Sequence, residues 1–292
     1  METRRTFPVG DYDLSATLNS GQAFRWQQHD GAWTGVIGSH WVRLKSDPST
    51  LTAETAAPVQ DWDWLQHYLQ LETDLGVVLR SFPDDEPMRA AVNACRGLRL
   101  LRQDPWECLA SFILSSTKQI VQIRQIVASL CERFGEPLPA PPTCGPAFAF
   151  PSPARLARVT EAELRACKMG FRAPYLRQTA GQIAAGQFAL DRLPQLPVDI
   201  ARRELMQLPG VGRKIADCVL LFAYGFPTAF PVDVWVMKGL RQLYFPRRRV
   251  PLTRLHRFAA THFGPNAGYA QQYLFHYLRM QGGAFRTSAA PG

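Results

Sequence analysis

The sequence predicts an α+β fold, in which an N-terminal antiparallel β-sheet domain is followed by an all-α domain. Short runs of aromatic and β-branched residues, separated by Asp-Gly and Gly-Ser turns, fill the first part of the chain and are typical of antiparallel strands. From residue 104 onward, helix-start signals and apolar residues at helical spacing replace this pattern. We therefore place the β-rich domain at 1–101, the helical domain at 102–280 and a disordered, Gly-rich polar tail at 281–292.

The β-rich part predicts an antiparallel meander with strands at 24–26, 33–37 and 41–44. The Asp-Gly pair within 29–32 predicts the first turn of this meander. A helical stretch at about 62–79 follows, and the Pro- and Asp-rich segment 83–87 ends it.

The helical part opens with a start signal at Asp104. This residue suits the N-cap, Pro105 suits the first turn, and Glu107 can close a capping box with the cap residue. A second apolar stripe begins at Ile120 and ends at Gly135, a residue suited to a helix C-terminus. The polar segment 115–119 would join these two helices.

Cap and turn signals extend the helical pattern almost to the end of the chain. Two further helices have identifiable caps, namely Thr160, which forms a capping-box pattern with Glu163, and Asp199. The remaining expected elements are a surface loop at 136–153, a turn at 208–212, and helices at 160–170, 199–207 and 213–224, after Asp233, after Thr253 and at 266–279.

The composition favours a polyanionic partner and gives no sign of a metal. The 292 residues include 33 Lys and Arg against 24 Asp and Glu, which gives a net charge of +9. No apolar run approaches the roughly 20 residues that a membrane helix needs, and no signal-peptide pattern opens the chain, so we expect an intracellular protein that does not bind membranes. The six cysteines are scattered without a C-x-x-C pattern, so we expect reduced thiols and no metal or other cofactor.

The most informative segment is the turn at 208–212 with the two basic residues that follow it. Gly210 and Gly212 flank Val211 and allow a tight hairpin, with backbone N–H groups facing outward at the start of the next helix. Such a helix start binds anions and suits a DNA phosphate, a contact that positions the duplex without reading its sequence. An ordinary helix corner is the alternative for a Gly-x-Gly taken alone. Lys214, on the first turn of that helix, makes the segment more specific.

The hairpin, Lys214 and a Gly- and Pro-containing loop that ends in Asp233 together resemble the helix-hairpin-helix superfamily of base-excision DNA glycosylases. Within it, segments 19–26, 104–109 and 169–173 look like those of the 8-oxoguanine DNA glycosylase/lyases of the eukaryotic type. The resemblance extends from about residue 12 to 279. It implies that the helical domain is a helix-hairpin-helix glycosylase domain.

The resemblance implies that Lys214 attacks the deoxyribose beneath a flipped-out purine, expels the base and forms a Schiff base, after which β-elimination nicks the strand. The attack requires an uncharged amine, and the adjacent Arg213 and the positive helix end both favour loss of its proton. Asp233 would stabilise the cationic sugar and also cap the helix that begins after it. The alternative for Lys214 is a solvated lysine on a basic face.

The resemblance also implies a pocket for the flipped base. Cys218 and Phe275 would lie on opposite faces of this base, and Gln271 would read its Watson–Crick edge. The backbone carbonyl of Gly21 would accept the N7 hydrogen that distinguishes 8-oxoguanine from guanine. Facing guanine, this acceptor would stay unpaired at a cost of about 1–3 kcal/mol. Without the resemblance, Cys218 and Phe275 would be interpreted as core residues and Gly21 as a turn.

The remaining implied contacts are with the DNA around the lesion. The backbone of Gly210, Val211 and Gly212 would bind phosphate, Arg172 would meet the base opposite the lesion, and Phe171 would insert into the gap beside it. The alternatives are a surface arginine and a core phenylalanine.

Three residues depart from the family pattern. Thr117 stands in a run that is usually rich in Asn and fills the space left by the flipped base. Gln122 stands where arginine is common, and Trp235 where histidine usually lies near the phosphate of the lesion. The sequence therefore does not fix which base is preferred opposite the lesion, and the local phosphate contact is expected to differ.

The favoured interpretation is a monomeric DNA glycosylase and AP lyase that excises 8-oxoguanine from double-stranded DNA. It would act in the cytoplasm, associated with the nucleoid, in a prokaryote, or in the nucleus of a eukaryote. One alternative keeps the mechanism but changes the substrate to another oxidised base, such as a ring-opened purine. Another is a non-enzymatic helix-hairpin-helix protein that binds duplex DNA, which would need neither a lysine–aspartate pair nor a base pocket.

Overall fold

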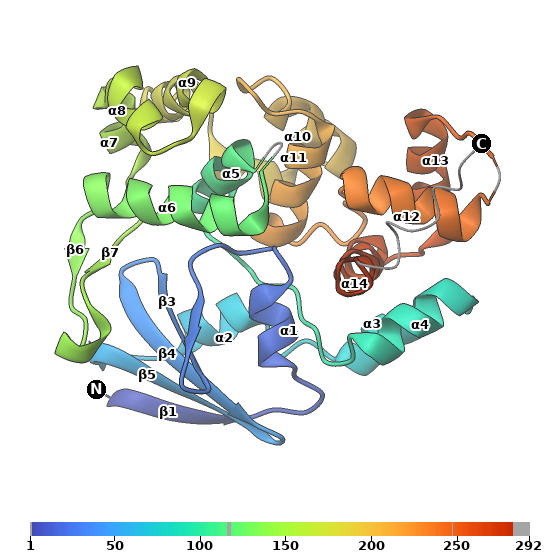
Figure 1. The fold of residues 1–292 in the computed structure, drawn as a ribbon, viewed down its shortest axis with the longest axis horizontal. Helices are drawn as coiled ribbons and strands as arrows, with labels where there is room; N and C mark the ends of the chain where they lie inside the picture. Colours follow the sequence, from blue (N-terminus) through green and yellow to red (C-terminus); the bar gives the residue numbers. More distant parts are fainter. Residues whose placement is uncertain (1, 116–117, 247, 283–292) are drawn as a thin grey trace.

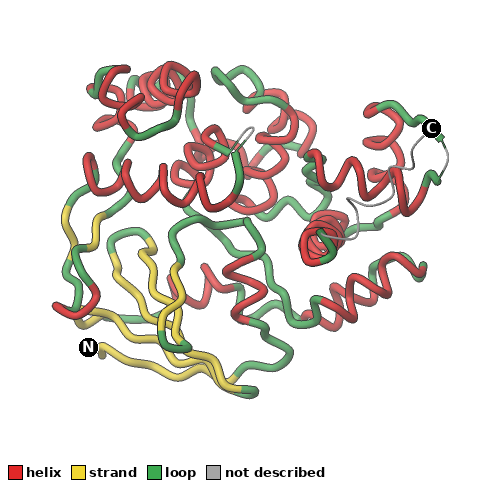
Figure 2. Tube along the Cα trace, viewed as in Figure 1, coloured by secondary structure: helices red, strands yellow, loops and turns green. Residues whose placement is uncertain are grey.

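The computed structural model describes residues 2–115, 118–246 and 248–282. A β-sheet and the helices packed on it form one part of the molecule, and the remaining helices form the other (Figures 1 and 2). The predicted α+β fold, with an N-terminal antiparallel sheet and a helical domain after it, is therefore confirmed. Among the described residues, no helix is both long and apolar enough to span a membrane.

The N-terminal sheet has five antiparallel strands in the order β1-β5-β4-β3-β2. Their bounds are Glu2–Pro8 (β1), Gln27–His29 (β2), Ala32–Ile37 (β3), His40–Asp47 (β4) and Thr50–Val59 (β5). The meander of β2, β3 and β4 confirms the predicted strands at 33–37 and 41–44, and β1 and β5 extend it. One face of the sheet is buried because alternate residues along each strand point to it, as Val42 and Leu44 do with no exposed surface.

The strand predicted at 24–26 is wrong, because this segment crosses between two hydrophobic cores. Trp26 packs in the core of the sheet domain, where its indole lies so close to Gly35 that an added Cβ there would be 2.6 Å from the ring. Phe24 instead packs in the core of the helical part, against Phe112. The paired strand begins only at Gln27.

The helix predicted at about 62–79 is two helices, α2 (Asp63–Leu69) and α3 (Leu75–Arg80). Gln70 ends α2 in the left-handed conformation at φ 55°, and the side chain of Asp74 caps α3 by accepting from Val77 N–H. Two short helices were not predicted, α1 (Leu14–Asn19) and α4 (Glu86–Ala94). The segment 83–87 is a break as expected, but α4 already begins inside it.

Helices α3 and α4 pack with the helical part of the molecule rather than on the sheet. Val78, Met88 and Ala91 belong to the same hydrophobic core as the later helices, and α4 contacts the last helix, α14 (Figure 1). A domain boundary at residue 101, as predicted from the sequence, stays a prediction. The same is true of the tail at 281–292, most of which lies outside the described residues.

Ten α-helices follow in the described part of the chain after residue 104. Their bounds are Pro105–Leu114 (α5), Ile120–Phe134 (α6), Pro153–Arg158 (α7), Glu161–Ala166 (α8), Ala173–Ala184 (α9), Val198–Leu205 (α10), Arg213–Val219 (α11), Val234–Tyr244 (α12), Leu252–His262 (α13) and Ala267–Met280 (α14). The loop predicted at 136–153 contains a small antiparallel ribbon of β6 (Pro137–Leu138) and β7 (Ala147–Phe148).

The predicted N-caps are right at Asp104 and at Thr160, where the capping box with Glu163 is also present. The capping box predicted for Glu107 is wrong, because its carboxylate instead pairs with Arg25 across 3.3 Å. Asp199 does not cap α10, which begins one residue earlier.

Arg25 and Gln22 join the sheet domain to the helical part. Besides its pairing with Glu107, the Arg25 guanidinium donates to the carbonyl of Phe148. Gln22 has no exposed surface; its amide donates to Arg99 O at 2.8 Å and accepts from Leu101 N–H at 2.8 Å. These bonds fix the turn that contains Gly21 against the segment leading into α5.

Candidate active site

The hairpin before α11 is formed as the two glycines predict. Gly210 has a φ of +75°, a conformation that favours glycine, and Gly212 is the N-cap of α11. Val211 is 5% exposed and its N–H donates to Leu208 O at 3.1 Å, so the expectation that the hairpin N–H groups face outward is wrong for this residue. The helix continues through a π-helical segment, Leu220–Tyr224, as far as Gly225.

The two hairpin glycines differ in a way that predicts different effects of alanine. At Gly210 an added Cβ would be 2.9 Å from the side chain of Tyr175, and the left-handed backbone adds about 1–2 kcal/mol of strain. At Gly212, φ is −90° and no atom lies within 4 Å of the new group. We expect Gly210→Ala to lower the free energy of unfolding, and Gly212→Ala to change it by less than about 1 kcal/mol, because the smaller entropy of the unfolded chain offsets the poorer N-cap. Urea denaturation measures both, and equal losses would contradict this description of the hairpin.

Lys214 lies at the start of α11, next to the end of α5. Its Nζ donates to Ser115 Oγ at 3.1 Å and lies 5.0 Å from the centre of the Phe112 ring. Cys218, one helical turn later, is close enough for Lys214 to lower the pKa of its thiol, although burial raises that pKa more strongly. The amine is thus held over an apolar ring by a hydroxyl group, at a partly buried position.

Asp233 is the N-cap of α12, as predicted, and lies near enough to Lys214 for the two side chains to interact electrostatically. Its Oδ1 accepts from Val236 N–H at 2.8 Å, which fixes the carboxylate at the end of the loop before α12. Burial raises the pKa of Asp233 above 3.8, while this N–H and the charges of Lys214 and Arg279 act in the opposite direction. An anion is therefore held close to the lysine at an energetic cost.

The residues expected to bind the base come from α11, α14 and the turn after α1. Cys218 is 3% exposed and Gln271 4% exposed, and the side-chain oxygen of Gln271 is buried with no hydrogen-bond partner among the described residues. Phe275 lies one turn after Gln271 on α14. A Cβ added at Gly21, whose φ is +81°, would be 3.4 Å from its ring. Phe275 and Gly21 are thus neighbours, and Gln271 has an unused acceptor.

The buried state of Cys218 predicts its chemical inertness. Burial raises the pKa of this thiol to about 12, so almost none of the reactive thiolate exists near neutral pH. Cys144 is the exposed cysteine of the described residues. We expect iodoacetamide at pH 8 to alkylate Cys144 in the native protein and leave Cys218 unmodified, as measured by peptide mass spectrometry. Cys144→Ser is the control, and rapid labelling of Cys218 would refute a closed site.

The expected DNA-contact residues outside the hairpin differ in their exposure to solvent. Phe171 is 57% exposed, as a residue that inserts into DNA would be, and the Arg172 guanidinium lies 4.3 Å from its ring centre. Arg172 itself is 2% exposed, so it would have to move to meet a base. Thr117 lies outside the described residues. Trp235 is 40% exposed on α12.

Four polar residues near this site were not predicted as site residues. Ser115 holds the amine of Lys214, and its place in the polar segment before α6 was the available signal. Arg124, Arg279 and Asn19 come together from three separate elements. The Arg124 Nη2 donates to Asn19 Oδ1 at 3.0 Å and the Arg279 Nη1 donates to Asn19 O at 3.5 Å. No local sequence pattern marks such a cluster.

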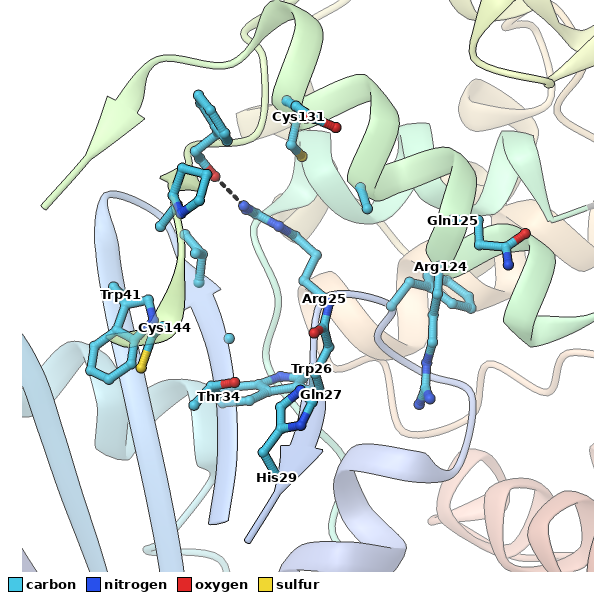
Figure 3. A pocket seen from close by; sticks show the side chains of 18 of the residues that line it. Arg25, Trp26, Gln27, His29, Thr34, Trp41, Arg124, Gln125, Cys131 and Cys144 are labelled. Carbon is cyan, nitrogen blue, oxygen red and sulfur yellow. Dashed lines mark hydrogen bonds between the residues drawn. The ribbon is translucent and has the colours of Figure 1, made fainter. Parts of the chain in front are cut away.

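A separate cavity of about 710 Å³ lies between the sheet and α6 (Figure 3). Trp26, Trp41 and Arg25 line it, together with Arg124 from α6. Lys214 and Asp233 do not line it. No group of three or more His, Cys, Asp or Glu that could hold a metal ion occurs among the described residues.

Comparison with known proteins divides the chain between two family models. Residues 6–109 match the N-terminal domain of 8-oxoguanine DNA glycosylase. Residues 110–259 match the HhH-GPD superfamily of base excision DNA repair proteins. The second match contains the hairpin, Lys214 and Asp233.

Full-length relatives and solved structures agree with these models. The chain is 30% identical to the probable N-glycosylase/DNA lyase of Methanothermobacter thermautotrophicus, over 94% of this chain and 96% of that protein. It is 33% identical to the N-glycosylase/DNA lyase OGG1 of Arabidopsis thaliana, over 94% and 80% of the two chains. It also superposes, with a TM-score of 0.88 and 30% identity over 97% of this chain and 100% of the other, on the Clostridium acetobutylicum 8-oxoguanine glycosylase/lyase bound to double-stranded DNA with cytosine opposite 8-oxoguanine.

Proposed function

We infer the chemistry of this protein from one premise: the chain belongs to the 8-oxoguanine DNA glycosylase family, within the HhH-GPD superfamily of base excision DNA repair proteins. It is an N-glycosylase/DNA lyase that excises 8-oxoguanine from duplex DNA. The observation that supports this function best is the amine of Lys214, which is hydrogen-bonded to Ser115 and lies within electrostatic range of the carboxylate of Asp233.

Lys214 acts as the nucleophile in this proposal. The lone pair of Nζ forms a bond to C1′ of the deoxyribose, while the electrons of the C1′–N9 bond leave with the purine, which takes up a proton. The bonded nitrogen then passes one proton to O4′ as the C1′–O4′ bond breaks, and the nitrogen lone pair forms the C1′=N bond of a protonated Schiff base. Removal of a proton from C2′ then eliminates the 3′ phosphate and nicks the strand. Ser115 would orient the amine toward the sugar.

Asp233 contributes a negative charge that is held in a fixed orientation in this proposal. Its carboxylate faces the position at which positive charge develops on the sugar, and its hydrogen bond from Val236 N–H prevents it from turning away. Because Asp233 is partly buried, less water screens its charge, so it would stabilise the positive charge on the sugar more strongly.

The base pocket in this proposal is formed by residues on both sides of the flipped purine. Cys218 and Phe275 contact its two faces, and the free oxygen of Gln271 accepts a hydrogen bond from its Watson–Crick edge. Gly21 O accepts the N7 hydrogen. The position of Gly21 beside Phe275 supports this assignment.

DNA contacts around the lesion complete the proposal. The hairpin of Gly210, Val211 and Gly212 binds a backbone phosphate, and the exposed Phe171 inserts beside the lesion. Arg172 reaches the opposite base after moving out of its buried position, and Thr117 lies in the segment that would fill the gap.

A single chain carries every group that this mechanism uses, so we propose that the protein acts as a monomer. Its site of action is that of its substrate, which is the nucleoid in a prokaryotic cytoplasm or the nucleus of a eukaryote. The sheet domain at 1–101 and the catalytic domain at 102–280 act together, since Gly21 comes from the first and Lys214 from the second.

A panel of lesions tests the substrate. Duplexes that carry 8-oxoguanine, a ring-opened guanine, unmodified guanine or a preformed abasic site are incubated with the protein in the presence of borohydride, which reduces a Schiff base to a stable adduct. We expect adducts with 8-oxoguanine and with the abasic site, and none with guanine. An adduct with the ring-opened base but not with 8-oxoguanine would change the substrate, and no adduct at all would reject the function.

A further inference from the structure

Arg279 lies among the residues expected to bind the flipped base, at the C-terminal end of α14. Its Nη1 would be 3.3 Å from a Cβ placed on Gly21, and its guanidinium carbon lies 5.5 Å from the centre of the Phe275 ring. Gln271, Phe275 and Arg279 follow each other at intervals of four residues, so they share one face of the helix. This arginine therefore belongs spatially to the base pocket.

Arg279 contacts Asn19, a residue that a second arginine also binds. Its Nη1 donates to the backbone carbonyl of Asn19, while Arg124 on α6 holds the side chain of the same Asn19. Burial and the charge of Arg124 both lower the pKa of Arg279, and Asp233 acts in the opposite direction. A cation that is partly dehydrated and close to another cation is poised to gain a new acceptor.

A purine oxygen would supply such an acceptor. The N7 edge of 8-oxoguanine presents the acceptor O6, the donor N7–H and the acceptor O8. A carbonyl at Gly21 and a guanidinium beside it would pair with the donor and with one adjacent oxygen. Guanine presents an acceptor at N7, so it matches the guanidinium but not the carbonyl.

We propose that Arg279 is a further base-binding residue that donates a hydrogen bond to O6 or O8 of the flipped base, next to the N7–H that Gly21 reads. This inference rests on the proposed function, because it requires a base at Gly21 and Phe275. Helix α14 would then supply three groups to the base: the Gln271 amide, the Phe275 ring and the Arg279 guanidinium.

The test compares Arg279→Gln with wild type on two substrates. On an 8-oxoguanine duplex, single-turnover base excision should fall about 10- to 100-fold, as expected for a lost hydrogen bond from a charged group. On a preformed abasic site, which has no base to contact, strand cleavage should fall no more than about 2-fold, because the missing interaction is only with the base. Arg165→Gln removes an equally charged arginine that pairs with Glu161 on the surface of α8, and it should change neither rate.

A binding measurement distinguishes the two oxygens. Lys214→Gln protein, which should not cleave, is titrated with duplexes containing 8-oxoguanine or 8-oxoadenine, with and without Arg279→Gln. Weaker binding of both lesions would identify O8, and weaker binding of 8-oxoguanine alone would identify O6, since adenine has an amino group at C6.

Two results would overturn the proposal. Unchanged excision of 8-oxoguanine by Arg279→Gln would show that the arginine makes no productive contact. An equal loss on the abasic site would show that it acts on the DNA backbone or on the fold, and a thermal melting curve separates these two causes. Failure of the wild-type protein to excise 8-oxoguanine would instead reject the proposed function itself.

Discussion

Glutamine in place of Lys214 is expected to abolish base excision and strand cleavage, with a loss of at least about 1,000-fold in the single-turnover rate. The amide of glutamine is not a nucleophile, so neither the bond to C1′ nor the Schiff base can form. A hydrogen bond to Ser115, which now joins Nζ and Oγ at 3.1 Å, is still possible for the shorter polar side chain. Denaturing gels of a labelled 8-oxoguanine duplex measure the rate.

Lys238 provides a matched control for this prediction. It is an exposed lysine on α12, and Lys238→Gln removes the same functional group without affecting Ser115 or Asp233. We expect the Lys238 variant to form the borohydride adduct as wild type does, and the Lys214 variant to form none. Trapping of the Lys214 variant would show that another amine performs the attack.

Asparagine in place of Asp233 is expected to give a folded protein whose excision rate falls by about 100-fold or more, comparable to the loss of other preorganised charges or donors in active sites. The asparagine side chain can still accept from Val236 N–H, so the cap of α12 is kept while the negative charge is removed. Alanine would also remove the cap, at a cost of about 1 kcal/mol in unfolding free energy.

The two variants together distinguish charge from structure. If the carboxylate acts through its charge, both variants lose activity but only Asp233→Ala melts at a lower temperature. Wild-type activity in Asp233→Asn would reduce Asp233 to a capping residue.

The pH dependence gives an independent check on Asp233. Burial raises its pKa above the usual 3.8, so the carboxylate becomes protonated at a higher pH than an exposed aspartate would. The activity that depends on this anion is therefore present above that pKa and is lost as the pH falls through it. We expect wild type to show this acidic limb in its single-turnover rate, and the residual activity of Asp233→Asn to lack it.

Several structural features formed by residues close together in the sequence were predicted correctly. The caps at Asp104, Thr160 and Asp233 were right, because a cap is formed by a side chain and a backbone group three residues away. The capping box of Glu107 was wrong because a partner 82 residues distant, Arg25, binds its carboxylate instead. A local sequence pattern cannot show that a residue distant in the sequence will bind the same side chain.

The residues of the candidate site also fall into two groups, according to whether a local sequence pattern marks them. The hairpin, Lys214 and Asp233 form a short sequence pattern with a chemical meaning, whereas Gly21, Cys218, Gln271 and Phe275 were assigned through family resemblance. Their roles stay predictions.

Arg279 could not have been found from the sequence. It is one of many arginines, and its contact with Asn19 joins residues 260 positions apart. Only the folded chain brings it beside Gly21.

The arrangement of α14 has a consequence for how substrate range could change during evolution. The stripe proposed to face the base holds Gln271, Phe275 and Arg279, while Gln272 and Tyr273, which donate to Ser20 O and Leu98 O, anchor the helix to the N-terminal part. The proposed nucleophile, Lys214, is on α11, and Asp233 is at the start of α12. Mutations confined to this stripe of α14 could thus change which lesion the enzyme accepts. Lys214, Asp233 and the anchoring hydrogen bonds of Gln272 and Tyr273 would stay unchanged.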